Sequence, residues 1–301
     1  MIKAELTKNC KKKSFLILTI ILAILSISWL ISVYVSSIKT IEMGMEYTDT
    51  QLVLLEPQNI FFQCMSQITL SIYIFPFIII GVILVYDDIK EKVILQVAVI
   101  QKSRIRYFMN KIAVLLLYNF TVLLSIFIIC LCFSLLLPNI NKGNIQDIFS
   151  IYTIFSFLIY WMGLTFWGIV AMAITCIFNS GIAGSCVALY VLIERIYTST
   201  SAVTIQNSLL MKLNEFLPWA NFNTLFVYAG DLKTLTSDMT QEIEIMKAST
   251  LTMYKYIHYN NSVVPYPYFK GLDEIIFACI VYLLFFIAIY VYYYNLRIKK
   301  S

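Results

Sequence analysis

Long apolar stretches without charged residues alternate with shorter polar segments along this chain. The longest covers residues 148–193, which are 46 positions without an Asp, Glu, Lys or Arg. As one helix it would measure roughly 69 Å, more than twice the ~30 Å hydrocarbon core of a bilayer, so the segment must fold back. Its one turn-like interruption is Asn179-Ser180-Gly181. The pattern therefore predicts two membrane helices joined by a very tight turn.

Four further apolar runs, at residues 14–37, 63–86, 112–138 and 275–296, are long enough to cross a bilayer. The predicted fold class is thus an all-α integral membrane protein with six transmembrane helices. We expect these helices at residues 14–37, 63–86, 112–138, 148–178, 181–198 and 274–296.

Composition and charge support this class and orient the chain. Hydrophobic residues make up 60% of the chain, and only 13% of the residues are charged. With a cytosolic N-terminus, segments 1–13, 87–111, 179–181 and 297–301 face the cytosol and hold 14 of the 22 basic residues. Lys and Arg accumulate on the cytosolic side of membrane proteins, so both termini are expected there. The net charge of +5 is then explained by the basic residues that orient the chain in the membrane, and no nucleic-acid partner is expected.

The cytosolic segment 87–111 has an unusual pattern for a connecting loop. It reads DDIKEKVILQVAVIQKSRIRYFMNK, with acids at its start, an apolar centre and bases at its end. That order of charges suits the dipole of a helix, here from about residue 88 to 101. Two interpretations remain open. The helix docks on a partner below the membrane, or it lies on the membrane surface with its basic rim on lipid headgroups.

The same segment resembles the permease subunits of type-2 ABC transporters, which are exporters with six helices per subunit. In that family an acidic stretch leads through Gly-Thr-Leu and an apolar run to Pro-x-Ser-Arg, and a Lys opens the third helix. The matching positions are Asp88 and Glu91, the apolar run 94–99, Ser103-Arg104 and Lys111. Lys92 and Val93 stand where Gly-Thr is usual, and Gln101 replaces the Pro. The resemblance extends over nearly the whole chain and is least secure at residues 37–62 and 231–273.

The resemblance implies that residues 87–111 form a coupling helix that docks on a separate ABC ATPase subunit. The implied coupling residues are Asp88, Glu91, Val97, Arg104 and Lys111. Residues 1–13 would form a cytosolic surface helix; alternatively, their lysines serve topology alone. The chain has no G-x-x-x-x-G-K-[ST] sequence, so ATP and Mg are expected in the partner, with no cofactor or enzymatic activity in this chain.

The outer part of the chain divides into three predicted regions. An outer loop covers 38–62, a re-entrant hairpin covers 203–230 and is broken at Leu217-Pro218-Trp219, and an extracytoplasmic subdomain covers 231–273. The subdomain is polar, rich in Thr and Tyr, and carries several acidic residues.

Two features mark a candidate substrate path or outer gate. Glu194 and Arg195 follow about thirteen residues of the fifth helix, roughly 20 Å from its inner end. Either they remain at membrane depth as a functional site, or the helix ends before them and both meet headgroups. In the sixth helix Tyr282, Phe286 and Tyr290 recur at four-residue intervals. They are candidates to line the path, with helix packing or an interfacial belt as the alternative.

These observations favour a permease subunit of an ABC exporter in the cytoplasmic membrane, with a peptide, such as an antimicrobial peptide, as the first candidate substrate. Its expected partners are ABC ATPase subunits, a second permease subunit that is the same or a related chain, and membrane lipid. A composition rich in Ile, Lys, Asn and Tyr and low in Gly suggests a low-GC bacterium. The alternative is a non-transporting immunity or sensor protein. One histidine, His258, predicts no metal site and disfavours an intramembrane protease.

Overall fold

The computed structural model describes a helical membrane protein with one small β-hairpin. The residues it describes are 13–42, 61, 64–65, 74–90, 104–136, 151–204, 217–218, 221–222, 225, 254–259, 262–267 and 272–300. Predicted features outside them, including Glu91, Val97 and most of the outer loops, are not placed.

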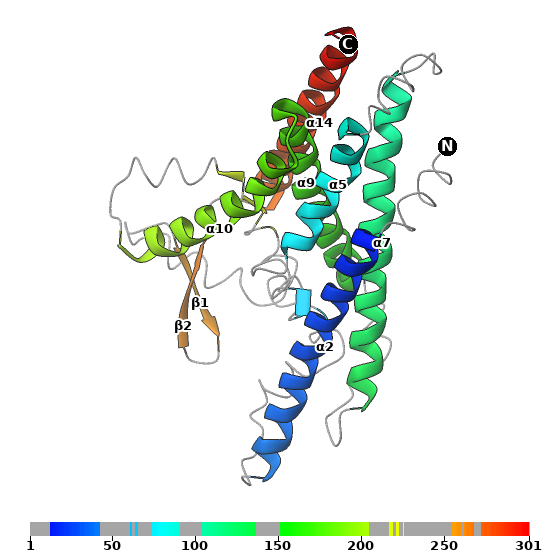
Figure 1. Ribbon diagram of the computed structural model, residues 1–301. Helices are drawn as coiled ribbons and strands as arrows, with labels where there is room; N and C mark the ends of the chain where they lie inside the picture. The colour runs from blue at the N-terminus through cyan, green and yellow to red at the C-terminus, as the bar shows by residue number, and fades with distance from the viewer. Residues whose placement is uncertain are drawn as a thin grey trace.

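The principal helices follow the apolar runs of the sequence (Figure 1). They are α2 (Lys13–Glu42), α5 (Phe75–Lys90), α7 (Arg104–Leu136), α9 (Ile151–Phe178), α10 (Gly181–Thr204) and α14 (Leu272–Lys300). Four of them contain segments long and apolar enough to cross a membrane, at Lys13–Val35, Met109–Phe133, Thr153–Phe178 and Glu274–Tyr292. Gly181–Glu194 is a shorter apolar segment. The protein is therefore a helical protein embedded in a membrane, whereas the six spans and the orientation of the termini stay predictions.

The exposed side of α2 is also apolar, as expected for a helix in contact with lipid. Its buried side chains, Phe15, Leu18, Leu22 and Leu30, lie on the side that packs against α5 and α7. The remaining side is exposed and carries large aliphatic residues, namely Leu16, Ile17, Ile20, Ile21, Ile24, Ile27, Ile31 and Val35. A helix that exposes so much apolar surface is stable against lipid rather than water.

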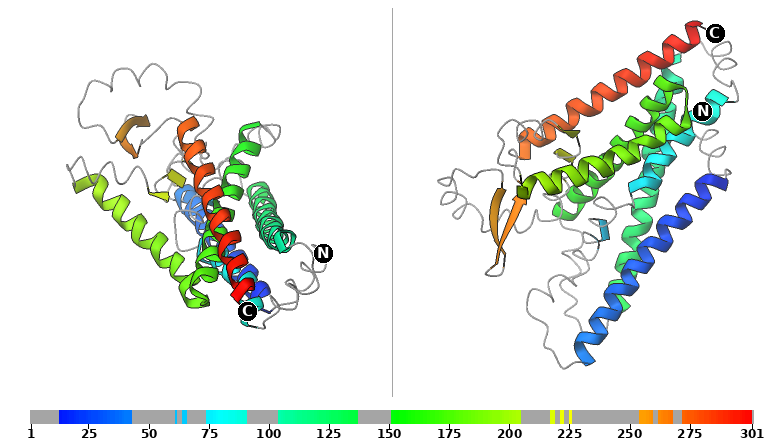
Figure 2. Two further views of the ribbon diagram at one scale, coloured as in Figure 1. Left: turned by 90° about the horizontal axis from the view of Figure 1, so that it is seen from above. Right: turned by 60° about the vertical axis from the view of Figure 1, so that its left-hand side comes forward.

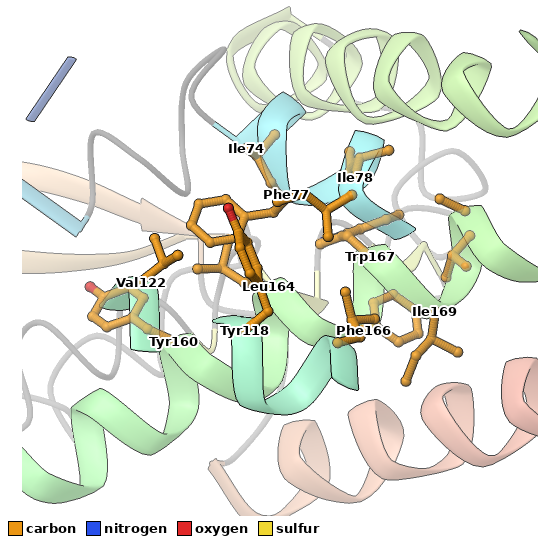
Figure 3. Close-up of a cluster of buried hydrophobic side chains, with 14 of the residues drawn as sticks. Ile74, Phe77, Ile78, Tyr118, Val122, Tyr160, Leu164, Phe166, Trp167 and Ile169 are labelled. Atoms are coloured by element: carbon orange, nitrogen blue, oxygen red, sulfur yellow. The ribbon is translucent and has the colours of Figure 1, made fainter. Parts of the chain in front are cut away.

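α5 and α9 form the centre of the bundle. α9 contacts α5, α7, α10 and α14, and α5 also contacts α2, α7 and α10. Figure 3 shows Phe77 and Ile78 of α5 in one cluster with Leu164 and Trp167 of α9. All four side chains are at most 1% exposed, so the core is built around this helix pair.

Glycine allows α5 and α9 to approach closely. A Cβ placed on Gly81 would meet the backbone of Gly168, with the Gly168 Cα at 2.9 Å and its carbonyl oxygen nearer still. Gly184 of α10 is similarly close to Thr175 and to the Ala171 carbonyl oxygen of α9. Small residues at helix contacts are typical of membrane proteins, where close packing supplies much of the stability.

The predicted turn between the fourth and fifth helices is confirmed. Asn179 has a φ of 56°, the left-handed conformation in which Asn often ends a helix. Ser180 then caps α10, because its Oγ accepts a hydrogen bond from Ala183 N–H at 3.4 Å and its carbonyl oxygen accepts one from Gly184 N–H at 3.2 Å. Figures 1 and 2 place this turn at the same end of the molecule as the C-terminal end of α14.

Two helix boundaries differ from the prediction at the segment 87–111. α5 continues to Lys90, and α7 begins at Arg104. Asp88 therefore belongs to α5, whereas Arg104 and Lys111 belong to α7. The part of the segment between these helices, 91–103, lies outside the described residues.

The hairpin comprises β1 (Tyr254–Tyr259) and β2 (Ser262–Pro267), which pair antiparallel. It lies within the predicted extracytoplasmic segment 231–273 and projects away from the helices (Figures 1 and 2). The helical class thus includes one element of sheet that the sequence analysis did not anticipate.

Candidate functional site

Glu194 is buried on α10 rather than exposed beyond its end. The helix continues to Thr204, ten residues further, and only 4% of Glu194 is exposed. The alternative in which the fifth helix ends before Glu194 is therefore wrong. α10 packs against α9 and α5, and burying a carboxylate in such a position requires hydrogen-bonding partners that offset its desolvation.

Tyr190 is a polar partner of Glu194 on the same helix. It lies one helical turn earlier on α10, and its side chain forms a hydrogen bond with the Glu194 carboxylate. Tyr282 of α14 is also close enough to interact electrostatically with Glu194. Tyr190 itself is 41% exposed, so the buried carboxylate lies directly beneath a side chain that reaches the surface.

Aromatic rings from three helices and a separate short segment form a series of contacts that begins at Tyr190. Trp167 lies 6.3 Å from Tyr190 and 5.0 Å from Phe166, measured between ring centroids. Phe166 in turn stacks on Phe222 at 4.2 Å and meets Phe286 of α14 edge-on at 5.8 Å. We call Glu194, Tyr190, Trp167, Tyr282, Phe166, Phe222 and Phe286 the carboxylate–aromatic cluster.

Phe222 reaches the cluster from the predicted re-entrant segment 203–230. Asn221 donates from both its backbone N–H and its side-chain amide to the Leu217 carbonyl oxygen, at 3.3 and 2.9 Å. These bonds form a helical turn that begins at Pro218, a position where the missing proline N–H costs nothing. Phe222 and Leu225 are buried, so this turn is anchored against the helices.

The structure brings together three of the five residues predicted for a substrate path or outer gate. Glu194, Tyr282 and Phe286 belong to the cluster. Tyr290 is fully buried on α14, one turn beyond Phe286. Arg195 lies in α10, but its side chain is outside the described part of the chain.

The remaining aromatic members escaped the sequence analysis. Tyr190 precedes Glu194 by four residues, a spacing that places both on one helix face and could have identified it. Trp167, Phe166 and Phe222 meet this face only through the packing of α9 and the 217–225 turn, for which the sequence carries no signal.

A carboxylate among aromatic faces is a suitable environment for a cation. The carboxylate supplies charge, and the π faces of Tyr and Trp attract ammonium or guanidinium groups. Ionisable residues inside membrane proteins usually mark paths for substrates, ions or protons. Among the described residues no group of three or more His, Cys, Asp or Glu is arranged for a metal ion.

The second candidate region joins the ends of α5 and α7. The Lys111 Nζ lies 2.5 Å from the Asp88 Oδ2, and both side chains are only 1% exposed. Two of the five predicted ATPase-coupling residues are therefore buried against each other. They cannot touch a partner protein directly, but they tie together the two helices that flank the segment 91–103. Arg104 is the first residue of α7, and its side chain lies outside the described residues.

Comparison with known proteins adds no identification. The chain matches no family model, no curated protein and no solved structure. Its function must therefore be argued from the membrane helices, the carboxylate–aromatic cluster and the Asp88–Lys111 pair.

Proposed function

We propose that this chain is the membrane-spanning permease subunit of an ABC exporter. The observation that carries the proposal is the buried Asp88–Lys111 salt bridge. It ties the last turn of α5 to α7, two turns after the start of α7, so the two helices that flank segment 91–103 are linked by a buried charge pair. When a partner displaces a segment held in this way, both flanking helices move together, which is the property required of a coupling helix.

The topology of the proposal follows the distribution of charge. Six spans, with both termini cytosolic, place segment 91–103 and the turn at Asn179 on the inner side with most of the basic residues. The ATPase is a separate P-loop protein that docks on this side. Two permease subunits and two ATPases make up the transporter in the cytoplasmic membrane of a low-GC bacterium.

A cationic peptide, such as an antimicrobial peptide, is the substrate class that fits the cluster. Glu194 provides the negative charge, Tyr190 and Tyr282 provide hydroxyl groups and aromatic faces, and the Trp167 ring lies beside that of Tyr190. Lys or Arg side chains of the peptide would bind there transiently during transport. The start of the predicted outer subdomain carries Asp231, Asp238, Glu242 and Glu244, which would attract the same charge.

Affinity purification of the tagged full chain from its native host tests the proposal. We expect a P-loop ATPase to co-purify in a complex with two copies of each subunit, and ATP hydrolysis only when that partner is present. A non-transporting immunity or sensor protein would instead purify without an ATPase and still protect the host. Transport by vesicles that contain this chain alone would also contradict the proposal.

A further inference from the structure

The two outer edges of the β-hairpin differ in their capacity to bind another strand. The register pairs Tyr254 with Pro267, Tyr256 with Pro265 and His258 with Val263. Between these pairs lie Lys255 with Tyr266, Ile257 with Val264 and Tyr259 with Ser262. The two prolines of β2 therefore occupy every second position of the strand.

Proline identifies which pairs exchange hydrogen bonds. In an antiparallel ladder, hydrogen-bonded and non-hydrogen-bonded pairs alternate, and proline has no N–H to donate. The pairs that contain Pro265 and Pro267 are thus the non-hydrogen-bonded kind, whose backbone groups point away from the partner strand. By the same alternation the backbone N–H and C=O groups of Tyr254, Tyr256 and His258 point to the outer edge of β1.

The outer edge of β2 is blocked, and that of β1 is not. On β2, two of the three outward positions are proline, so only Val263 has an N–H to offer. On β1 all three outward positions have both a donor and an acceptor. Within the described part of the chain the sheet contains only these two strands. An edge strand with intact hydrogen-bonding groups is a template for a further strand, and prolines on an edge prevent such pairing.

We propose that β1 pairs antiparallel with β1 of a second copy of this chain, with Tyr256 opposite its own copy. This register forms roughly six backbone hydrogen bonds and converts two hairpins into one four-stranded sheet. A two-stranded hairpin alone is marginally stable in water, and additional strands stabilise it.

The side chains of β1 are compatible with pairing of this strand to β1 of a second copy. Centring on Tyr256 places Tyr254 opposite His258 of the other copy and Lys255 opposite Ile257. Aromatic pairs across strands are favourable, and the only charged residue of the strand meets an aliphatic residue rather than its own charge. The pairing is two-fold symmetric, as expected for association of identical chains. It requires neither an ATPase nor a peptide substrate, and therefore does not depend on the proposed function.

Disulfide cross-linking of the full chain in membranes tests the register. Residues in a hydrogen-bonded antiparallel pair have Cα atoms about 5.5 Å apart, within the range that a disulfide spans. Tyr256→Cys is expected to give a covalent dimer upon oxidation with copper phenanthroline. Val263→Cys, on the blocked edge of β2, and the parent chain with its seven native cysteines are the matched controls and should remain monomeric on a denaturing gel.

A second pair of variants distinguishes this register from chance collision. Tyr254→Cys and His258→Cys, co-expressed on differently tagged copies, should form mixed dimers, whereas neither should cross-link with itself. Adding Tyr256→Pro removes an outward N–H without breaking the hairpin ladder and should abolish the mixed dimer. Val263→Pro should leave it unchanged. Equal cross-linking of Tyr256→Cys and Val263→Cys would overturn the proposal. It would also be overturned if neither Tyr256→Cys nor the Tyr254→Cys/His258→Cys pair cross-linked, which would mean that β1 pairs with a different strand.

Discussion

Asp88 near the end of α5 and Lys111 in α7 form a salt bridge of 2.5 Å from which solvent is almost completely excluded. In sequence the two residues lie on opposite sides of the segment 91–103. Their contact therefore links the helices that lead into and out of that segment. A charge in such an environment has no water to replace its partner, so the two side chains depend on each other.

Removing either partner should destabilise the protein strongly. Asp88→Asn leaves the Lys111 ammonium buried without its counter-charge, and Lys111→Met leaves the Asp88 carboxylate in the same position. We expect each single change to lower the free energy of unfolding by about 3–5 kcal/mol. Thermal unfolding of the purified protein in detergent measures the loss.

The double variant and an exposed neighbour are the controls for this pair. Asp88→Leu with Lys111→Met replaces the pair by apolar side chains and should recover much of the stability. Lys90→Gln changes an exposed lysine at the end of α5 and should cost under about 1 kcal/mol. Single variants as stable as Lys90→Gln would show that the pair contributes little.

The close contact between Gly81 and Gly168 should not tolerate a larger side chain. The new methyl group of Gly81→Ala meets the Gly168 backbone, which cannot rotate away as a side chain can. We expect a loss of about 1–3 kcal/mol from displacement of α5 against α9. Gly181→Ala is the matched control, because its methyl group would meet only the Tyr86 ring at 3.1 Å. Equal melting temperatures for both variants would contradict this interpretation.

The apolar runs were sufficient to predict the principal helices but not their ends. Charged residues at 87–111 suggested a separate helix from about residue 88 to 101, whereas Asp88 belongs to α5 and Lys111 to α7. The reason is a contact between residues far apart in sequence: each charge removes the cost of burying the other. Glu194 is likewise buried within a helix, and Tyr190 one turn earlier on α10 forms a hydrogen bond with it.

The hairpin was less accessible to prediction for a different reason. Tyr254–Tyr259 and Ser262–Pro267 are rich in aromatic and β-branched residues and are separated by Asn260-Asn261, a usual signal for a hairpin. Pro265 and Pro267 argue against a strand unless their register is known. In the register that β1 and β2 adopt, the same prolines are compatible with a strand, because both occupy non-hydrogen-bonded positions.

Charge reversal in the proposed coupling region should separate ATP hydrolysis from transport. Glu91→Lys and Arg104→Glu change polar positions of the segment expected to contact the ATPase, where a charge-assisted hydrogen bond contributes about 1.5–3 kcal/mol. We expect membrane insertion to be unchanged and transport per ATP hydrolysed to fall. Reconstituted vesicles measure both rates, with Glu274→Lys in α14 as the charge-reversal control outside residues 87–111. Normal transport by both variants would favour a helix that only lies on the membrane surface.

Glu194 should determine how strongly a cationic substrate binds. Glu194→Gln keeps the shape and a hydrogen-bonding group for Tyr190 but removes the negative charge. Losing a charged interaction of about 1.5–3 kcal/mol should weaken the apparent affinity for a lysine-rich amphipathic peptide roughly 10- to 100-fold. Glu274→Gln, an exposed carboxylate near the start of α14, should leave the affinity unchanged. Transport assays over a range of peptide concentrations, compared with a neutral peptide of equal length, provide the measurement. If both peptides lose affinity equally in Glu194→Gln, the carboxylate stabilises the helices and does not recognise charge.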